Sequence, residues 1–320
     1  MTAERADGLA VGRAEIEAAA ARIAPYVRRT PLMRLEAGGG RPACELKLEL
    51  VQRTGSFKAR GAFNTLLSSN VPESGVAAAS GGNHGAAVAY AARTLGHPAA
   101  IFVPEIVTPA KRAAIEAAGA EIHIGGARYA EALAACEAYQ AATGAMSIHA
   151  YDAARTIAGQ GTVAAEWEAD TDGLDTVLIG VGGGGLIAGC AAWFGGRVRV
   201  VGVEPVGSCC LHAALAAGEP VDVSVESVAA DSLGAKSTGA LNFAIAREHV
   251  SGVTLVTDAA ITEAQRTLWR EARLVTEPGG AAAFAALNSG AYEPAPGERV
   301  GVLVCGANVD LTAFGRLLAQ

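Results

Sequence analysis

Four consecutive glycines, Gly182 to Gly185, follow an apolar run that predicts a buried strand and precede an apolar helical stretch that begins at Leu186. The backbone N–H groups of such a loop converge at a helix N-terminus, where they bind anions. The loop lacks the GxGxxG spacing, and no Lys-Ser or Lys-Thr pair follows it, so it predicts a phosphate site without a nucleotide. The alternative is a flexible turn in a glycine-rich chain.

Lys58 is the second residue that could do chemistry. It lies between the aromatic Phe57 and a run of small residues within the segment 54–62. Lysine is usually a solvated surface charge. Apolar surroundings instead lower the pKa of its ammonium group and favour the neutral amine that bonds with a carbonyl carbon. Such a lysine combined with a phosphate loop suggests pyridoxal phosphate.

The elements that would position these residues alternate between short β-rich runs and Ala-rich helical stretches, which is typical of a mostly parallel sheet covered by helices. The predicted strands are 44–48, 76–79, 99–103, 121–124, 176–181, 198–204, 253–256 and 300–305. The predicted helices are 1–23, 84–95, 109–118, 129–142, 162–169, 186–193, 262–272 and 280–287, and the irregular stretch 205–250 predicts loops and short helices. Ligands collect at the carboxyl ends of parallel strands, so we expect the loops 80–85 and 182–185 to share one site.

Composition excludes several classes of function. The net charge of −7 argues against nucleic-acid binding, which needs a clustered basic surface. No apolar run reaches the roughly 18–20 residues that cross a bilayer, and the N-terminus does not resemble a signal peptide, so we expect a cytoplasmic protein. The six cysteines form no CxxC pair and the six histidines form no HExxH motif, so we expect no metal site.

The segment 47–61 resembles the lysine motif of serine/threonine dehydratases and serine racemases; the related cysteine and threonine synthases usually have Lys-Asp-Arg where this chain has Lys58-Ala59-Arg60. The resemblance continues in the family's order over nearly the whole chain. The matching segments are 30–32 (Thr-Pro-Leu), 80–85 (Ser-Gly-Gly-Asn-His-Gly), 158–162 (Ala-Gly-Gln-Gly-Thr), 182–185, 203–205 (Val-Glu-Pro), 230–231 (Ala-Asp), 277–281 (Glu-Pro-Gly-Gly-Ala) and 305–310 (Cys-Gly-Ala-Asn-Val-Asp). It implies an α/β, fold type II (tryptophan synthase β-like) pyridoxal-phosphate enzyme with two domains, each a mostly parallel sheet flanked by helices.

The resemblance also implies a role for each matching position. Lys58 would carry pyridoxal 5'-phosphate, with Phe57 and Ser232 on the two faces of its ring. Asn83 would bind the phenolic oxygen of the cofactor, and Cys305 would bind its ring nitrogen. The phosphate would be bound by Gly182, Gly183, Gly184, Gly185 and Leu186. The substrate carboxylate would be held by Ser80, Gly82, Asn83 and His84. An uncharged Cys305 leaves the ring nitrogen unprotonated, which suits prompt expulsion of a β-substituent.

Several other residues have open interpretations. Glu277 lies near the cofactor in this interpretation, or it caps the helix that begins near 279–281. Tyr151 and Asp152 follow a strand end near the expected substrate pocket and could tune specificity. The remaining histidines without motif context are interpreted as structural or surface residues: His149, His212 and His249.

The sequence departs from the racemases at two places. Gly81 replaces a serine that serves them as the second base, so proton transfer on both faces of the substrate is not expected. They also bind a divalent cation through acidic residues, of which Glu204 alone remains here, because residues 208–210 (Ser-Cys-Cys) are poor ligands for a hard cation. The chain ends ten residues after Asp310, so we expect no C-terminal regulatory domain.

These observations predict a large cofactor-binding domain of residues 1–68 and 147–320. Residues 69–146 would form a small domain that carries residues 80–85, which we call the asparagine loop. The predicted reaction is β-elimination of L-threonine, L-serine or both to a 2-oxo acid and ammonia. The alternatives are a serine or other amino-acid racemase, a dehydratase for 3-hydroxyaspartate or phenylserine, a β-replacement synthase, and a non-catalytic amino-acid sensor. Family members are commonly dimers, so the resemblance implies a homodimer.

Overall fold

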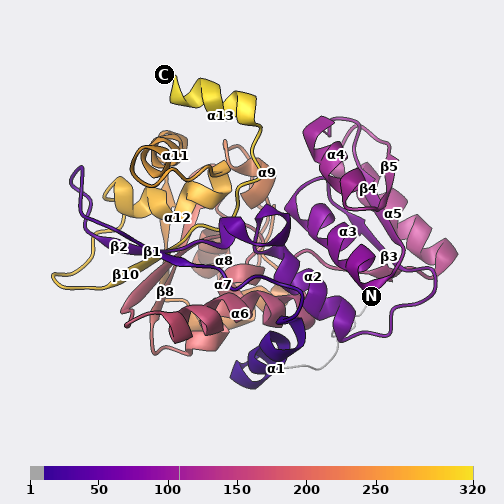
Figure 1. Cartoon of the computed structure of the whole chain (residues 1–320), viewed down its shortest axis with the longest axis horizontal. Coiled ribbons are helices and arrows are strands. Elements are labelled where there is room, and N and C mark those ends of the chain that lie inside the picture. The colour runs from indigo at the N-terminus through magenta and orange to yellow at the C-terminus, as the bar shows by residue number, and fades with distance from the viewer. Residues whose placement is uncertain (1–10, 108, 320) are drawn as a thin grey trace.

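The computed structural model describes residues 11–107 and 109–319, which form two separate sheets (Figure 1). The larger sheet has six strands, in the order β1 (Leu32–Leu35), β2 (Cys44–Lys47), β10 (Val300–Leu303), β7 (Thr176–Gly180), β8 (Arg199–Pro205) and β9 (Gly252–Val256). All neighbouring pairs are parallel except β1 with β2. Because β10 lies between β2 and β7, the segments that follow their carboxyl ends are neighbours.

The smaller sheet has four parallel strands, in the order β5 (Glu121–Ile124), β4 (Ala99–Val103), β3 (Val76–Ala79) and β6 (Met146–Ser147). All five residues of β4 are buried. Such a continuous apolar run is typical of a parallel strand with helices on both faces. The predicted domain boundary after residue 146 falls within β6.

Helices cover both faces of the larger sheet. On one face α1 (Arg13–Ile23), α6 (Ala154–Asp170) and α7 (Gly185–Phe194) enclose a core around the fully buried Trp167. On the other face α11 (Asp258–Ala272) and α12 (Pro278–Asn288) pack through a run of buried alanines. The helices α8 (Cys210–Ala217), α9 (Ala230–Leu233) and α10 (Ala240–His249) lie within the irregular stretch, and α13 (Leu311–Leu318) lies at the top edge in Figure 1.

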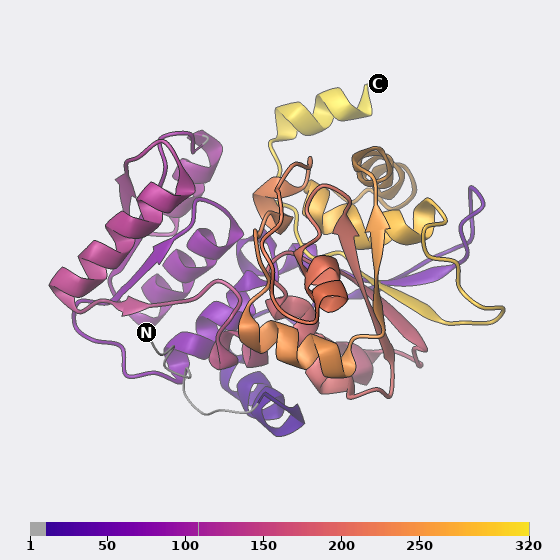
Figure 2. The ribbon, with the colours of Figure 1, turned by 180° about the vertical axis from the view of Figure 1, so that it is seen from behind.

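The smaller sheet, with α3 (Asn83–Leu95), α4 (Pro109–Ala117) and α5 (Tyr129–Thr143), forms the right-hand lobe of Figure 1 and the left-hand lobe of Figure 2. Between the lobes lies α2 (Lys58–Leu67). Its buried Phe63 belongs to the core beneath β3 and β4, while the same helix packs against α6 of the other lobe. The helix that begins at Lys58 therefore contacts both halves of the molecule.

The α/β prediction and the predicted strands are confirmed to within one or two residues at each end, but β1, β6, α2 and α13 were not predicted. The predicted start of a helix at residue 162 was wrong, because α6 begins at Ala154. Gly159 and Gly161 lie inside this helix, although glycine is a poor helix former. A Cβ on Gly159 would lie 2.7 Å from the Arg60 carbonyl oxygen, and one on Gly161 would lie 2.8 Å from that of Gly189. These glycines let α2 and α7 approach α6 closely.

Part of the predicted N-terminal helix, residues 1–10, lies outside the described residues. In the part of the chain that is described, no helix is both long and apolar enough to cross a membrane.

Candidate active site

Lys58 is the first residue of α2, and its half-buried side chain points to the segment that links β6 to α6. Its Nζ donates a hydrogen bond to the Ala150 carbonyl oxygen at 2.8 Å and lies 5.2 Å from the centroid of the Phe57 ring. Desolvation lowers the pKa of the Lys58 ammonium to about 8, although the nearby Cys305 and Glu277 oppose the change. Lys58 can therefore supply a neutral amine close to neutral pH.

Cys305 follows β10 and is joined to the lysine segment by the backbone. The Phe57 N–H donates to the Cys305 carbonyl oxygen at 3.3 Å, and Ser56 forms a bridge with Gly306. The Cys305 thiol is buried and points at the Gly279 carbonyl oxygen, 3.5 Å away. Burial raises the pKa of this thiol, so Cys305 presents an uncharged group.

The tetraglycine loop connects β7 to α7, as the sequence predicted. Gly184 is the N-cap of α7 and has φ +96°, which side chains rarely tolerate. A Cβ on Gly183 would overlap the Tyr151 ring, and one on Gly185 would lie 2.7 Å from the Tyr151 carbonyl oxygen. Asn242 holds the loop by donating from Nδ2 to the Gly183 carbonyl oxygen at 2.8 Å.

The loop thus presents bare backbone at a helix N-terminus, the arrangement that binds phosphate. Leu186 has its side chain in the core beneath α7, so only its backbone is available to the loop. Ser232, in α9, lies beside the loop: a Cβ on Gly182 would be 3.3 Å from the Ser232 carbonyl oxygen, and one on Gly279 would overlap Ser232 Oγ. Gly279 therefore contacts Ser232 on one side and Cys305 on another.

The asparagine loop follows β3 and leads into α3, whose N-cap is Gly82. The Gly82 N–H donates to Ser80 Oγ at 3.3 Å. The first backbone N–H groups of α3 have no partner within the helix and attract negative charge. This end of α3 can therefore hold a carboxylate.

His84 is buried, and its Nε2 lies 2.9 Å from the Ile148 carbonyl oxygen. Burial lowers the pKa of His84 to about 3, so the imidazole is neutral and donates to that carbonyl. The part of His84 left to contact a substrate is its backbone N–H.

Asn83 contacts two residues of the larger lobe. Its Nδ2 donates to Glu277 Oε1 at 2.6 Å, and its Oδ1 accepts from Asn308 Nδ2 at 2.6 Å. Glu277 is the N-cap residue of α12, yet its side chain makes no capping hydrogen bond. Glu277 therefore caps α12 through its backbone, since its carbonyl oxygen accepts from the Ala281 N–H at 3.2 Å, while its side chain contacts the asparagine loop.

A buried ion cluster anchors the helix that carries Lys58. Arg60 donates to both carboxylate oxygens of Glu49, at 2.9 and 2.5 Å, and also to Glu166 at 3.0 Å. Lys47 completes the cluster with an ion pair to Glu166 at 2.7 Å. Arg60, two residues after Lys58, is thereby committed to structure.

Asp152 and His149 both have structural contacts near the lysine. Asp152 accepts hydrogen bonds from the Leu241 and Asn242 N–H groups, both at 3.1 Å, so it fixes the start of α10. His149 Nδ1 accepts from the Asp152 N–H at 2.8 Å, in agreement with its interpretation as a structural or surface residue. Desolvation lowers the pKa of His149, and the charge of Lys58 contributes to that change.

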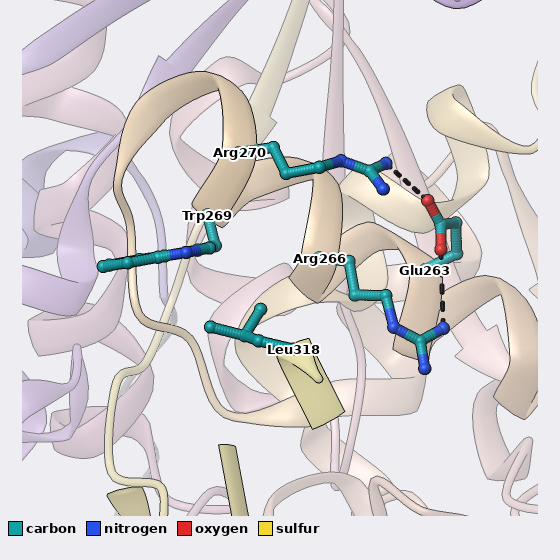
Figure 3. A pocket seen from close by; sticks show the side chains of 5 residues that line it. All are labelled: Glu263, Arg266, Trp269, Arg270 and Leu318. Atoms are coloured by element: carbon teal, nitrogen blue, oxygen red, sulfur yellow. Dashed lines mark hydrogen bonds and ion pairs between the residues drawn. The ribbon is translucent and has the colours of Figure 1, made fainter. Parts of the chain in front are cut away.

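A pocket of about 320 Å³ lies elsewhere, between α11 and α13 (Figure 3). It is lined by Glu263, Arg266, Trp269, Arg270 and Leu318. Both arginines contact Glu263, at 3.5 and 2.6 Å, as the dashed lines show. The pocket includes no residue of the lysine, glycine or asparagine segments, so it is separate from the candidate active site.

Residues 23–306 match the family model described as "Pyridoxal-phosphate dependent enzyme". The chain belongs to this family. It is 36% identical to phenylserine dehydratase of Ralstonia pickettii over 93% of both chains, and 38% identical to the biosynthetic L-threonine dehydratase of Mycobacterium bovis over 96% of this chain and 74% of that one. The solved structure of maize serine racemase superposes with a TM-score of 0.91 at 33% identity, covering 97% of this chain and 98% of the racemase. The resemblance to this group of dehydratases and racemases is confirmed, and with it the fold type II assignment.

The residues present fit the cofactor of a pyridoxal-phosphate dependent enzyme. Lys58 supplies an amine whose pKa is lowered to about 8. The glycine loop presents backbone at the N-terminus of α7, and Tyr151 packs where side chains on Gly183 and Gly185 would lie. Cys305 places a neutral thiol next to Lys58, close enough for each group to influence the pKa of the other. Among the described residues there is no group of three or more His, Cys, Asp or Glu that could hold a metal ion.

Proposed function

We propose that this pyridoxal-phosphate enzyme catalyses β-elimination of L-threonine, L-serine or both, releasing a 2-oxo acid and ammonia. The observation that carries the proposal is the desolvated Lys58 amine, held at 2.8 Å from the Ala150 carbonyl oxygen in the same site as a bare glycine loop. Relatives of 36% and 38% identity that act as dehydratases support the choice of reaction.

The proposed roles toward the cofactor follow the positions described above. Lys58 would carry it, the backbone of 182–186 would hold the phosphate, Phe57 and Ser232 would lie on its two faces, and Cys305 would face its ring nitrogen. Asn83 would donate to its phenolic oxygen. When bound, the cofactor delocalises the negative charge that develops at the substrate Cα.

The substrate carboxylate would lie at the N-terminus of α3, between Ser80 Oγ and the backbone N–H groups of Gly82, Asn83 and His84. The Lys58 amine, freed when the substrate amine takes its place, would remove the proton from Cα, which a neutral amine can do and an ammonium cannot. The β-hydroxyl group would depart as water by taking up a proton, which the Lys58 ammonium formed in the previous step can return. The released enamine hydrolyses to the 2-oxo acid and ammonia.

Replacing Lys58 with Ala tests this assignment. Release of 2-oxo acid from L-threonine and L-serine should disappear, together with the visible absorbance of the bound cofactor. Lys236→Ala is the matched control, because Lys236 is exposed and should be replaceable without loss. Continued deamination by the Lys58→Ala protein would end the proposal.

A racemase is the second candidate, favoured by the close superposition on maize serine racemase. Gly81 speaks against it, because a glycine offers no second base. The space beside Gly81 is also narrow: a Cβ there would lie 3.2 Å from Val107 Cγ2 and 3.5 Å from Val103 Cγ1. Chiral chromatography after incubation with L-serine separates the two, since an eliminating enzyme yields pyruvate and a racemase yields D-serine.

The preferred β-hydroxy amino acid is a separate question, because one methyl group changes discrimination by only about 1–3 kcal/mol. A panel of threonine, serine, 3-hydroxyaspartate and phenylserine, compared by kcat/KM for 2-oxo acid release, assigns it. We also propose a cytoplasmic homodimer with domains 1–68 plus 147–320 and 69–146. Six free cysteines support a reducing compartment, and light scattering measures the mass in solution.

A further inference from the structure

Three side chains connect the asparagine loop to the lysine segment through a continuous series of hydrogen bonds. Asn83 Nδ2 donates to Glu277 Oε1 at 2.6 Å. Asn308 Nδ2 donates to Asn83 Oδ1 at 2.6 Å and to the Thr54 carbonyl oxygen at 2.8 Å. The series thus joins the first turn of α3, the start of α12, the segment after β10 and the approach to Lys58.

The direction of every bond in this series is fixed by its two ends. An ionised carboxylate and a backbone carbonyl can only accept hydrogen bonds, whereas a side-chain amide has one accepting and one donating end. Glu277 therefore requires the NH₂ end of Asn83, and Thr54 requires the NH₂ end of Asn308. The two amides then meet correctly, with the Asn308 NH₂ donating to the Asn83 oxygen. Turning either amide by 180° would bring oxygen against oxygen.

The backbone is shaped around the two outer members of the series. A Cβ on Gly306 would overlap Glu277 Oε1, and a Cβ on Gly55 would overlap Asn308 Oδ1. Gly55 also has φ +74°, a conformation that other residues adopt only with strain. Glu277 and Asn308 are therefore built into the site and are not incidental neighbours of Asn83.

This arrangement determines what Asn83 can offer a ligand. Its oxygen is engaged by Asn308 and one Nδ2 hydrogen is engaged by Glu277, which leaves the second Nδ2 hydrogen to donate. We propose that Glu277 and Asn308 are positioning residues that hold the Asn83 amide with this N–H directed at the phenolic oxygen of the cofactor. The inference rests on the proposed role of Asn83 and on Lys58 as the cofactor anchor.

Three variants separate orientation from simple contact and from charge. Asn308→Ala removes one partner but leaves Glu277 to orient Asn83, and water replaces the lost bonds because residue 308 is exposed. Asn308→Asp puts a second carboxylate against Asn83, which competes for its NH₂ and turns the amide. The double variant Glu277→Gln with Asn308→Asp restores the net charge and reverses both bonds of the Asn83 amide, since the introduced glutamine can donate and the introduced aspartate can accept. Like Asn308→Ala, it removes the donor to the Thr54 carbonyl oxygen, so that loss is common to all three variants.

The measurements are the dissociation constant of pyridoxal phosphate, from absorbance titration of cofactor-free protein, and the pH midpoint of the absorbance of the bound cofactor. Asn308→Ala should weaken binding by no more than about threefold, whereas Asn308→Asp and the double variant should each weaken it by about tenfold or more and shift the pH midpoint. Wild-type affinity and pH midpoint in Asn308→Asp would overturn the inference. So would recovery of wild-type affinity in the double variant, because charge and not orientation would then be responsible.

Folding and anchoring are checked separately. If Asn308→Asp fails to fold, the double variant, in which both ends of the Asn83 amide have a partner, carries the test alone. Borohydride reduction of the wild-type holoenzyme followed by peptide mass analysis shows whether the cofactor is attached to Lys58. A missing adduct at Lys58 would refute the proposed function, whereas an adduct combined with unaltered Asn308→Asp binding would refute only the role of Glu277 and Asn308.

Discussion

Replacing Lys58 with Met should stabilise the cofactor-free protein at neutral pH, because the site holds an ammonium group that it solvates poorly. Desolvation lowers the pKa of Lys58 from its ordinary 10.5 to about 8. That difference corresponds to about 3.4 kcal/mol at 1.36 kcal/mol per pH unit. The half-buried side chain keeps some contact with water, and losing the hydrogen bond to Ala150 costs about 0.5–1.5 kcal/mol. We therefore expect a net gain of about 1–2 kcal/mol in the free energy of unfolding.

The sign of the pH dependence follows from the direction of the pKa change. Between pH 8 and 10.5 the unfolded chain binds a proton at Lys58 that the folded chain has released, so wild-type stability rises with pH in this window. The methionine variant has no such group. Its advantage over the wild type should be complete below about pH 8 and should vanish as the pH approaches 10.5.

Lys47→Met is the matched control, because Lys47 is also buried but carries an ion pair to Glu166 at 2.7 Å and donates to the Thr30 carbonyl oxygen at 2.8 Å. Its removal leaves a largely buried carboxylate without that partner, which should destabilise the protein by about 3 kcal/mol. Urea unfolding of cofactor-free proteins near pH 7 and near pH 10, followed by circular dichroism, measures both changes. A Lys58→Met protein that is less stable than wild type at pH 7, or a difference that does not change with pH, would refute the reasoning.

Three further outcomes are expected. Gly183→Ala should weaken pyridoxal-phosphate binding by about tenfold or more in absorbance titrations, because the new methyl group would overlap the Tyr151 ring and force the loop to shift, whereas Gly315→Ala, where a Cβ meets nothing within 4 Å, should bind normally. Arg60→Met should lower the free energy of unfolding by about 3–5 kcal/mol, measured by urea titration, since it leaves the buried Glu49 carboxylate without its cation; wild-type stability would contradict this. EDTA should leave the rate of 2-oxo acid release unchanged, because both carboxylate oxygens of Glu204 already accept backbone N–H groups at 2.9 and 2.8 Å; a loss restored by Mg²⁺ would show a cation site.

Much of the fold was readable from local patterns. The strands β3 and β4 have the predicted bounds, since continuous apolar runs between turn residues identify buried parallel strands. The strand β5 also has its predicted bounds, although its residues alternate between polar and apolar and none of them is buried. Local patterns failed in α6, which begins at Ala154 and not at residue 162 and which contains Gly159 and Gly161. Their spacing reflects close contact with α2 and α7, residues distant in the sequence, and no local pattern reveals such a contact.

The amino-acid sequence by itself determined the chemistry of the site: a lysine in apolar surroundings, a glycine loop between a strand and a helix, and the order of motifs that marks the family. The tertiary structure decided which groups meet them. Ala150, 92 residues from Lys58, binds its amine, and Glu277, 194 residues from Asn83, fixes the direction of its amide. Residue types and local periodicity are written along the chain, whereas hydrogen-bond partners depend on how the two sheets and α2 pack together. For the same reason the hydrogen-bond partners of Glu277 and Asp152 could not be predicted from the sequence.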